Sequence, residues 1–86
     1  MRYVIEAFWA GRPQHCEVTT RAKYARAVEN LGRIIFTDGT VLILTVRELK
    51  PREKAPRPIN GYGSLIGQCV RQGKSHVADL VEEKRT

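Results

Sequence analysis

The chain opens with an alternation of apolar and polar positions that predicts a β-hairpin. In residues 2–9 the odd-numbered positions share one apolar face, and Glu6 lies on the other face. A period of two is typical of a half-buried strand. Gly11 and Pro13 then indicate a turn, because glycine permits a positive φ and proline fixes its own. We expect residues 14–18 to return as a second strand paired with the first.

The next segment predicts the clearest helix of the chain. Apolar side chains recur at helical spacing and form one stripe, whereas basic residues, Arg26 among them, lie on the opposite side. Thr19 or Thr20 stands where a capping residue is expected, and Gly32 stands where a helix commonly ends. The stripe consists of Tyr24, Ala27, Val28 and Leu31.

Asp38-Gly39 predicts a second hairpin, because it is the strongest short turn signal in the chain. We expect residues 33–37 and 40–47 to pair around it as antiparallel strands. Two hairpins that flank one helix predict a small antiparallel sheet of about four strands, in the order ββαββ.

A two-residue loop at Asp38-Gly39 would make both faces of this hairpin apolar. In that register Ile34 opposes Ile43, and opposed residues share a face. One face then carries Ile34, Phe36, Val41 and Ile43, and the other carries Ile35, Leu42, Leu44 and Val46. Because the first helix can cover only one face, a second element must cover the other.

Residues 49–62 interrupt the pattern and predict a basic, proline-rich linker. Its prolines exclude a regular helix, and cationic side chains are spaced among them. The prolines are Pro51, Pro56 and Pro58, and the cations are Lys50, Arg52, Lys54 and Arg57. A solvated crossover between a sheet and a helix would need the same prolines, so this interpretation stays open beside a binding role.

Residues 63–84 predict a C-terminal helical segment. Ser64 can cap it, and its apolar residues recur in steps of four and three, which keeps them on one side of a helix. If Gly73 breaks the helix, it divides the segment in two, with Ser75 as the second cap. We expect the segment to cover the second face of the sheet or to bind a partner. Residues 1–86 are thus predicted to form one α+β domain.

The basic surplus is the main functional signal. The formal net charge is +6 and the pI is about 9.8, which favours nucleic acid, anionic lipid headgroups or an acidic protein surface as a partner. Cations spaced by prolines can contact a phosphate backbone at low ordering cost, and exposed aromatic rings can stack on single-stranded bases. The candidate binding residues are Arg26, Arg47, Lys50, Arg52, Lys54, Arg57, Trp9 and Tyr62.

The patterns of enzymes and metal sites are not met. Five residues separate Gly67 from Gly73, whereas a phosphate-binding P-loop requires four. The two histidines and two cysteines lack the paired spacing of a structural zinc site. Cys16 follows His15, but neighbours on a strand point to opposite faces and cannot act as a nucleophile with its base. We therefore expect a non-catalytic protein without metal or cofactor.

The sequence also bears on location. Residues 1–10 lack the apolar region of a signal peptide, and the longest apolar run, residues 41–44, is far too short to cross a bilayer. We expect a cytoplasmic protein without a membrane partner, in which Cys16 and Cys69 remain reduced.

The layout resembles the small accessory proteins that tailed bacteriophages encode for host takeover or against host defence. Size carries this resemblance, together with the strand Tyr3-Val4-Ile5-Glu6-Ala7-Phe8-Trp9, a compact helix, the hairpin Phe36-Thr37-Asp38-Gly39-Thr40 and a polar tail. It implies stoichiometric action in the host cytoplasm, by occlusion of a host enzyme, a defence complex or nucleic acid.

Three functions follow from these patterns. We favour a small basic module that binds nucleic acid or nucleoprotein. The alternative is a stoichiometric protein–protein inhibitor or adaptor of the phage type, which docks on an acidic surface of a host protein. The third is a homodimer whose interface is the apolar stripe of the C-terminal segment.

Overall fold

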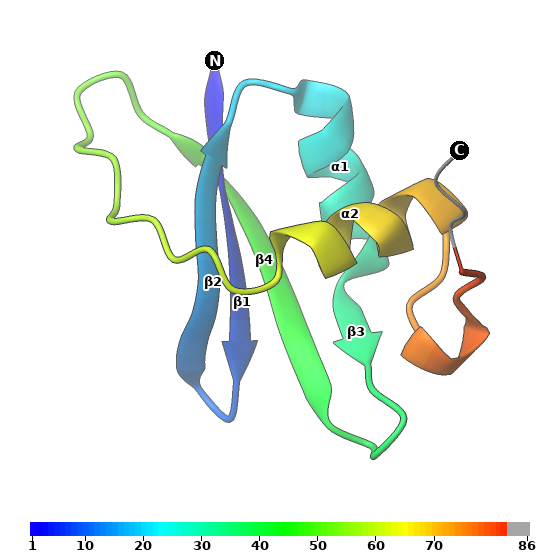
Figure 1. Cartoon of the computed structure of the whole chain (residues 1–86). Coiled ribbons are helices and arrows are strands. Elements are labelled where there is room, and N and C mark those ends of the chain that lie inside the picture. The colour runs from blue at the N-terminus through cyan, green and yellow to red at the C-terminus, as the bar shows by residue number, and fades with distance from the viewer. Residues whose placement is uncertain (83–86) are drawn as a thin grey trace.

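The computed structural model describes residues 1–82, which form a four-stranded antiparallel sheet with two helices against it (Figure 1). The strands lie in the order β2-β1-β4-β3. This arrangement confirms the predicted α+β class, with a ββαββ order and a C-terminal helix. The elements are β1 (Arg2–Trp9), β2 (Arg12–Thr19), α1 (Ala22–Leu31), β3 (Arg33–Ile35), β4 (Val41–Leu49), α2 (Gly63–Gln72) and a 3-10 helix (Val77–Asp79).

The first hairpin forms around a tight turn. Trp9 pairs with Arg12, and the two residues between them, Ala10 and Gly11, have positive φ angles of 49° and 76°. Two positive φ angles are typical of the I′ turn that connects two-residue hairpins. β2 is longer than predicted and includes Pro13, which its edge position in the sheet allows.

The second hairpin forms, but its predicted register is wrong by one residue. Ile34 pairs with Leu42 instead of Ile43, and the loop comprises residues 36–40. Within the loop the Asp38 carboxylate accepts a 2.9 Å hydrogen bond from the backbone N–H two residues on. The Gly39 N–H also donates to the Phe36 carbonyl at 3.0 Å, and together the side-chain and backbone bonds favour the wider loop.

The corrected register separates the two faces of the sheet. A shift of one residue exchanges the faces of a strand, because side chains alternate along it. Ile34, Leu42 and Leu44 therefore lie in the core, whereas Ile43 is 47% exposed on the opposite face. Ile35 pairs with Val41 on that opposite face, so the predicted assignment of Ile34 and Ile35 to the two faces is wrong, although both faces of the hairpin carry apolar residues.

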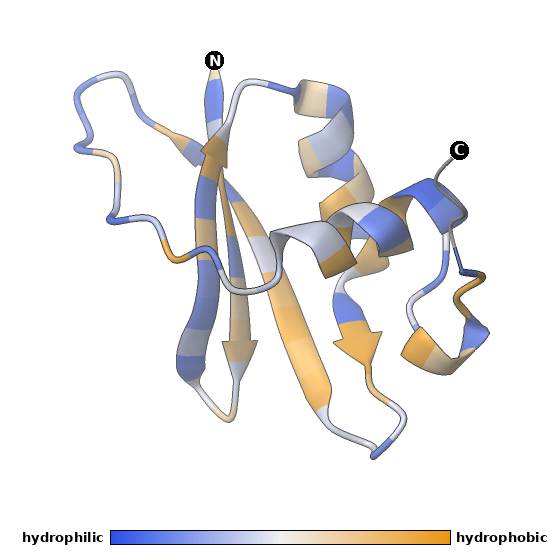
Figure 2. Ribbon diagram, in the orientation of Figure 1, coloured by the Kyte–Doolittle hydropathy of each residue, from blue (hydrophilic) through white to orange (hydrophobic). Residues whose placement is uncertain are grey.

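Both helices pack on the same face of the sheet, and the main core lies between them and the strands (Figure 1). Val28 of α1 is fully buried there, as are Ile66 and Cys69 of α2. Figure 2 shows hydrophobic residues concentrated along β4 and β3, beside this layer. The strands contribute Ile5, Ala7, Ile34, Leu42 and Leu44. The expectation that the C-terminal helix covers the second face is therefore wrong.

Later parts of the chain cover the two outer strands in part. Cys16 of β2 exchanges two backbone hydrogen bonds of 3.0 Å with Ile59, so the linker adds one antiparallel bridge to the sheet. Ile35 of β3 donates its N–H to the Ser75 carbonyl at 2.8 Å. A second, small cluster is buried on the face opposite the helices and consists of Val4, Cys16 and Leu49.

The helix starts differ from the predicted caps. α1 begins after Arg21, and the Thr19 hydroxyl accepts a 3.1 Å hydrogen bond from the Arg21 N–H just before the helix. α2 begins at Gly63 after Tyr62, so Ser64 lies inside the first turn instead of capping it. Neither helix has a side-chain hydrogen bond from its capping residue.

Gly73 ends α2 in the left-handed conformation, with φ 64° and ψ 32°. Glycine adopts this conformation without a Cβ clash, which explains why the helix stops there. The predicted segment 63–84 is therefore divided, and its second part is the short 3-10 helix Val77–Asp79. Residues 83 and 84 of that prediction lie outside the described residues.

The register predicts unequal costs for two isoleucines of the second hairpin. Ile34→Ala removes a fully buried side chain and is expected to lower the free energy of unfolding by about 2–5 kcal/mol. Ile43→Ala removes a half-exposed side chain and is expected to cost less than about 1.5 kcal/mol. Urea denaturation of both variants measures the difference, and equal losses would contradict the observed register.

Candidate nucleic-acid interface

Contacts with β4 hold the start of the linker. Arg47 forms a 2.6 Å ion pair with Glu53, and Glu53 also accepts a 3.3 Å hydrogen bond from the Lys50 N–H. These contacts lower the pKa of Glu53, with the hydrogen bond from Arg47 as the largest cause. The Arg47 guanidinium also lies 3.9 Å from Glu6. Arg47, a predicted binding residue, therefore positions the linker.

The four predicted linker cations extend from this loop into solvent. Lys50, Arg52, Lys54 and Arg57 are all exposed. Within residues 1–82, Arg52, Lys54 and Arg57 form no ion pair with a carboxylate. Glu53, the one acidic residue among them in the sequence, is paired with Arg47. The loop thus presents several unneutralised positive charges close together.

The far end of the linker crosses β2 in close contact. After the bridge between Ile59 and Cys16, the chain passes the Gln14 carbonyl at Gly61 and reaches Tyr62. A Cβ at residue 61 would lie 2.5 Å from that carbonyl oxygen, which is too close for any side chain. Glycine is therefore required where the linker crosses the strand.

A buried histidine fixes the position of Tyr62. His15 is 1% exposed, and its Nδ1 accepts a 3.2 Å hydrogen bond from the Tyr62 N–H. In the neutral ring the hydrogen then lies on Nε2, which is 3.5 Å from the Glu17 carboxylate. Cys16, the neighbour of His15 in sequence, belongs to the cluster on the other face. His15 thus acts as a structural contact between β2 and the start of α2.

Three aromatic side chains surround one hollow at the end of the sheet. We call it the aromatic hollow; it has a volume of about 210 Å³ and is lined by Trp9, Gln14, Phe36, Thr40, Leu42 and Tyr62. The Phe36 and Tyr62 rings meet edge to face, with centroids 6.1 Å apart and planes at 68°. Trp9 is 49% exposed beside them. The structure therefore brings the two predicted stacking residues, Trp9 and Tyr62, together.

Sequence reasoning missed Phe36 because it placed this residue in a strand. The residue lies in the 36–40 loop, which turns its ring toward Tyr62. The signal that could have predicted this position is Asp38, because an aspartate side chain can accept a hydrogen bond from the backbone two residues on and so favour a longer loop.

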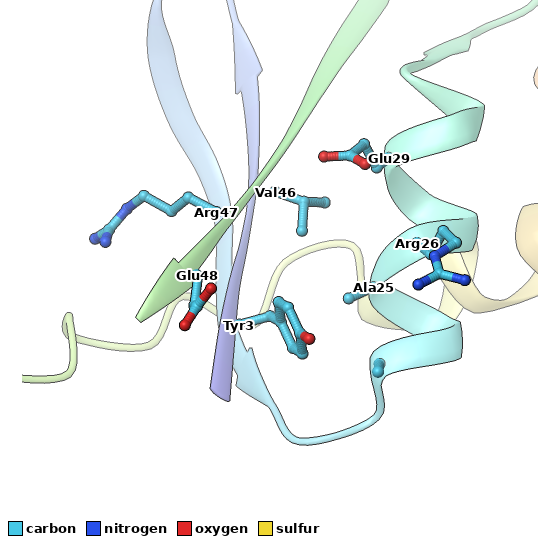
Figure 3. Close-up of a pocket in the computed structure, with 8 residues that line it drawn as sticks. Tyr3, Ala25, Arg26, Glu29, Val46, Arg47 and Glu48 are labelled. Carbon is cyan, nitrogen blue, oxygen red and sulfur yellow. The ribbon is translucent and has the colours of Figure 1, made fainter. Parts of the chain in front are cut away.

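Arg26 lies away from the linker. It lines a hollow of about 210 Å³ between α1 and the ends of β1 and β4, together with Tyr3, Glu29 and Glu48. Figure 3 shows that the Arg47 side chain points away from this hollow, on the other side of the sheet. Arg47 thus belongs to the lining of the same hollow as Arg26, but the two side chains extend to opposite sides of the sheet.

A cleft between β2 and the two helices holds two further arginines that the sequence did not indicate. Arg21 and Arg71 line it with Tyr24 and Glu17, in a volume of about 340 Å³. The Arg21 guanidinium lies 5.0 Å from the Tyr24 ring centre. Burial and Glu17 raise the pKa of Tyr24, and the two arginines partly offset this. Tyr24, which belongs to the predicted apolar stripe of α1, thus packs against the core and also forms a wall of this cleft.

Positive charge is concentrated outside the sheet. The four strands carry four basic and three acidic residues, so the sheet is nearly neutral. The linker carries four basic residues and one acidic residue. Segments 20–31 and 63–74, which include both helices, carry five basic residues and one acidic residue. The linker and the helical layer are therefore the two cationic regions of residues 1–82.

Comparison with family models, curated proteins and solved structures gives no match for this chain. Across residues 1–82, His, Cys, Asp and Glu side chains nowhere gather in a group of three that could hold a metal ion. The helices of this described part are too short or too polar to span a bilayer. The function must therefore be inferred from the geometry.

The Gly61 crossing predicts a steric effect of one methyl group. Gly61→Ala places a Cβ against the Gln14 carbonyl and is expected to lower the free energy of unfolding by about 1–3 kcal/mol. Gly63→Ala is the matched control, because its Cβ would meet only side-chain atoms, at 3.4 Å. Thermal or urea denaturation measures the stability of both variants. A loss of unfolding free energy in Gly63→Ala that equals or exceeds the loss in Gly61→Ala would contradict the close crossing.

The Arg47–Glu53 pair predicts a shifted titration. The pKa of Glu53 is lowered in the folded state, so the pair stabilises the fold at pH values above the ordinary glutamate pKa of about 4.3. This stabilisation is lost as the pH falls through the lowered pKa of Glu53. Carboxyl-carbon NMR should show a lowered midpoint for Glu53. The midpoint should rise in Arg47→Gln and stay in place in Arg57→Gln, and an unchanged midpoint in Arg47→Gln would rule out the pair.

Proposed function

We propose that this chain is a small basic, non-catalytic module that binds nucleic acid or nucleoprotein in the cytoplasm, with the linker cations as its main phosphate contacts. One observation carries the proposal. The linker is held at both ends, by Arg47–Glu53 and by Cys16–Ile59, yet the cations between these contacts are exposed. A loop built only to cross from the sheet to α2 would not need four cations on its outer side.

Electrostatics favours a phosphate backbone as the ligand of this loop. A phosphate backbone presents negative charges at regular intervals, and Lys50, Arg52, Lys54 and Arg57 are spaced at two to three residues. Loop ends that are already held reduce the conformational entropy lost on binding. Phosphate contacts position a ligand without reading its sequence, so this surface supports binding of low sequence specificity.

The test is the salt dependence of binding. Fluorescence anisotropy with a labelled oligonucleotide should show an affinity that falls steeply between about 50 and 200 mM salt. Replacing Lys50, Arg52, Lys54 and Arg57 together by Ala should reduce the slope of log K against log salt by about 3, because four phosphate contacts are lost.

The control variant removes the same charge elsewhere. Arg2, Lys23, Arg33 and Lys74 are exposed and lie outside the linker. Their joint replacement by Ala should weaken binding much less than the linker variant does. Equal losses in both variants would contradict the linker as the contact surface. Absence of binding at low salt would contradict the function itself.

A second candidate is a stoichiometric inhibitor or adaptor of the phage type, which binds a host protein. The observation that favours it is the sheet face opposite the helices, where Ile43 is half-exposed beside Phe8, its partner across the strands. Arg33 pairs with Ile43 on the other side, so this face combines apolar and cationic groups and suits an acidic protein surface. This candidate replaces the first if oligonucleotides do not bind and a partner remains bound after nuclease treatment.

A further inference from the structure

The aromatic hollow lies where the linker ends. From Arg57 the chain runs past Ile59, which is bridged to β2, and arrives at Tyr62 on the wall of the hollow. Figure 1 shows this part of the linker descending beside β2 and crossing in front of it to α2. The linker cations and the hollow are thus connected by one segment that is fixed against the sheet.

The hollow has the groups that a flat heteroaromatic ligand needs. Trp9 remains 49% exposed although it is a large apolar side chain. The backbone of Tyr62 is held by its hydrogen bond to His15, and its ring packs edge to face against Phe36. The Gln14 amide and the Thr40 hydroxyl lie among the lining residues and offer donors and acceptors to the edge of a base. Stacking on aromatic rings tolerates every base, because each has a π-face.

We infer that the aromatic hollow receives an unpaired nucleobase, so that the ligand of this module is a single-stranded nucleic acid whose backbone contacts the linker cations. The inference rests on the proposed function. In a duplex both faces of each base are stacked on neighbouring bases, and a base can enter the hollow only when it is free of the stack.

The dimensions agree with a short single strand. Five residues of chain lead from Arg57 to Tyr62, so the two residues lie at most about 16 Å apart. At about 3.4 Å per nucleotide in a stacked strand, this distance corresponds to about five nucleotides. A strand of about eight to ten nucleotides therefore covers the hollow and the cations of the loop.

Trp9 is the only tryptophan of the chain, so its fluorescence reports on the hollow directly. The probes are oligo(dT) of ten nucleotides and a duplex of ten base pairs, at one fixed salt concentration. We expect the single strand to quench Trp9 emission and to bind more tightly than the duplex, which leaves the emission unchanged.

Variants at Tyr62 and Trp9 test the stacking. Tyr62→Ala should weaken binding of the single strand by about 5- to 100-fold, the loss of one stacked base, and leave binding of the duplex unchanged. Tyr62→Phe keeps the aromatic ring and should retain the preference for the single strand over the duplex. Should Tyr62→Ala unfold, Trp9→Ala removes a half-exposed ring instead, with labelled oligonucleotides as the readout.

The outcomes separate the two proposals. Equal affinities for single strand and duplex with unchanged Trp9 emission would overturn the inference and leave the proposed function standing. A single-strand preference that survives in both alanine variants would overturn it as well. Binding of neither probe at low salt would remove the proposed function and the inference together. Quenching by a tryptophan-free apolar peptide but not by oligo(dT) would assign the hollow to a protein partner.

Discussion

The backbone contact between β2 and the end of the linker determines where the functional groups of this domain lie. Two 3.0 Å hydrogen bonds join Cys16 to Ile59, and the absence of a side chain at Gly61 lets the linker continue directly over Gln14. Tyr62 is then held by His15. Each of these contacts is made by backbone or buried atoms, so the crossing tolerates little displacement.

The same crossing sets the position of α2. The linker leaves the sheet at the end of β4, passes around the outer strand and arrives on the face that α1 already covers (Figure 1). Because α2 begins at Gly63, directly after the crossing, its apolar residues Ile66 and Cys69 meet the core formed by α1 and the strands. The opposite face receives no helix from the described residues and keeps Ile43 half-exposed.

Local patterns were sufficient to predict the elements of this fold. The alternation in β1, the turn at Gly11 and the stripe of α1 that ends at Gly32 are all properties of neighbouring residues. The register of the second hairpin was not predictable in this way, because the hydrogen bond of the Asp38 side chain competes with the two-residue loop. The face chosen by α2 depends on the route of the linker, and an apolar stripe is compatible with either face.

The residues of the candidate interface likewise divide into those that local sequence predicts and those that depend on the tertiary structure. The exposed linker cations were predictable from prolines that exclude helix and from charge that excludes burial. The role of Arg47 was not, because its pairing with Glu53 depends on how the linker folds back toward β4. The aromatic hollow combines Trp9, Phe36 and Tyr62 from three separate segments, and only the tertiary structure brings them together.

The bridges at Cys16 and Ile35 also affect how copies of this chain meet one another. The unpaired backbone of an outer strand is a template onto which another chain can add a strand. In this domain β3 is only three residues long and contacts Ser75, while β2 contains Pro13 and is bridged by Ile59. Opening of the linker would therefore expose an edge of the sheet. The bridge between Cys16 and Ile59 thus occupies part of the edge of β2 to which another copy could otherwise add a strand.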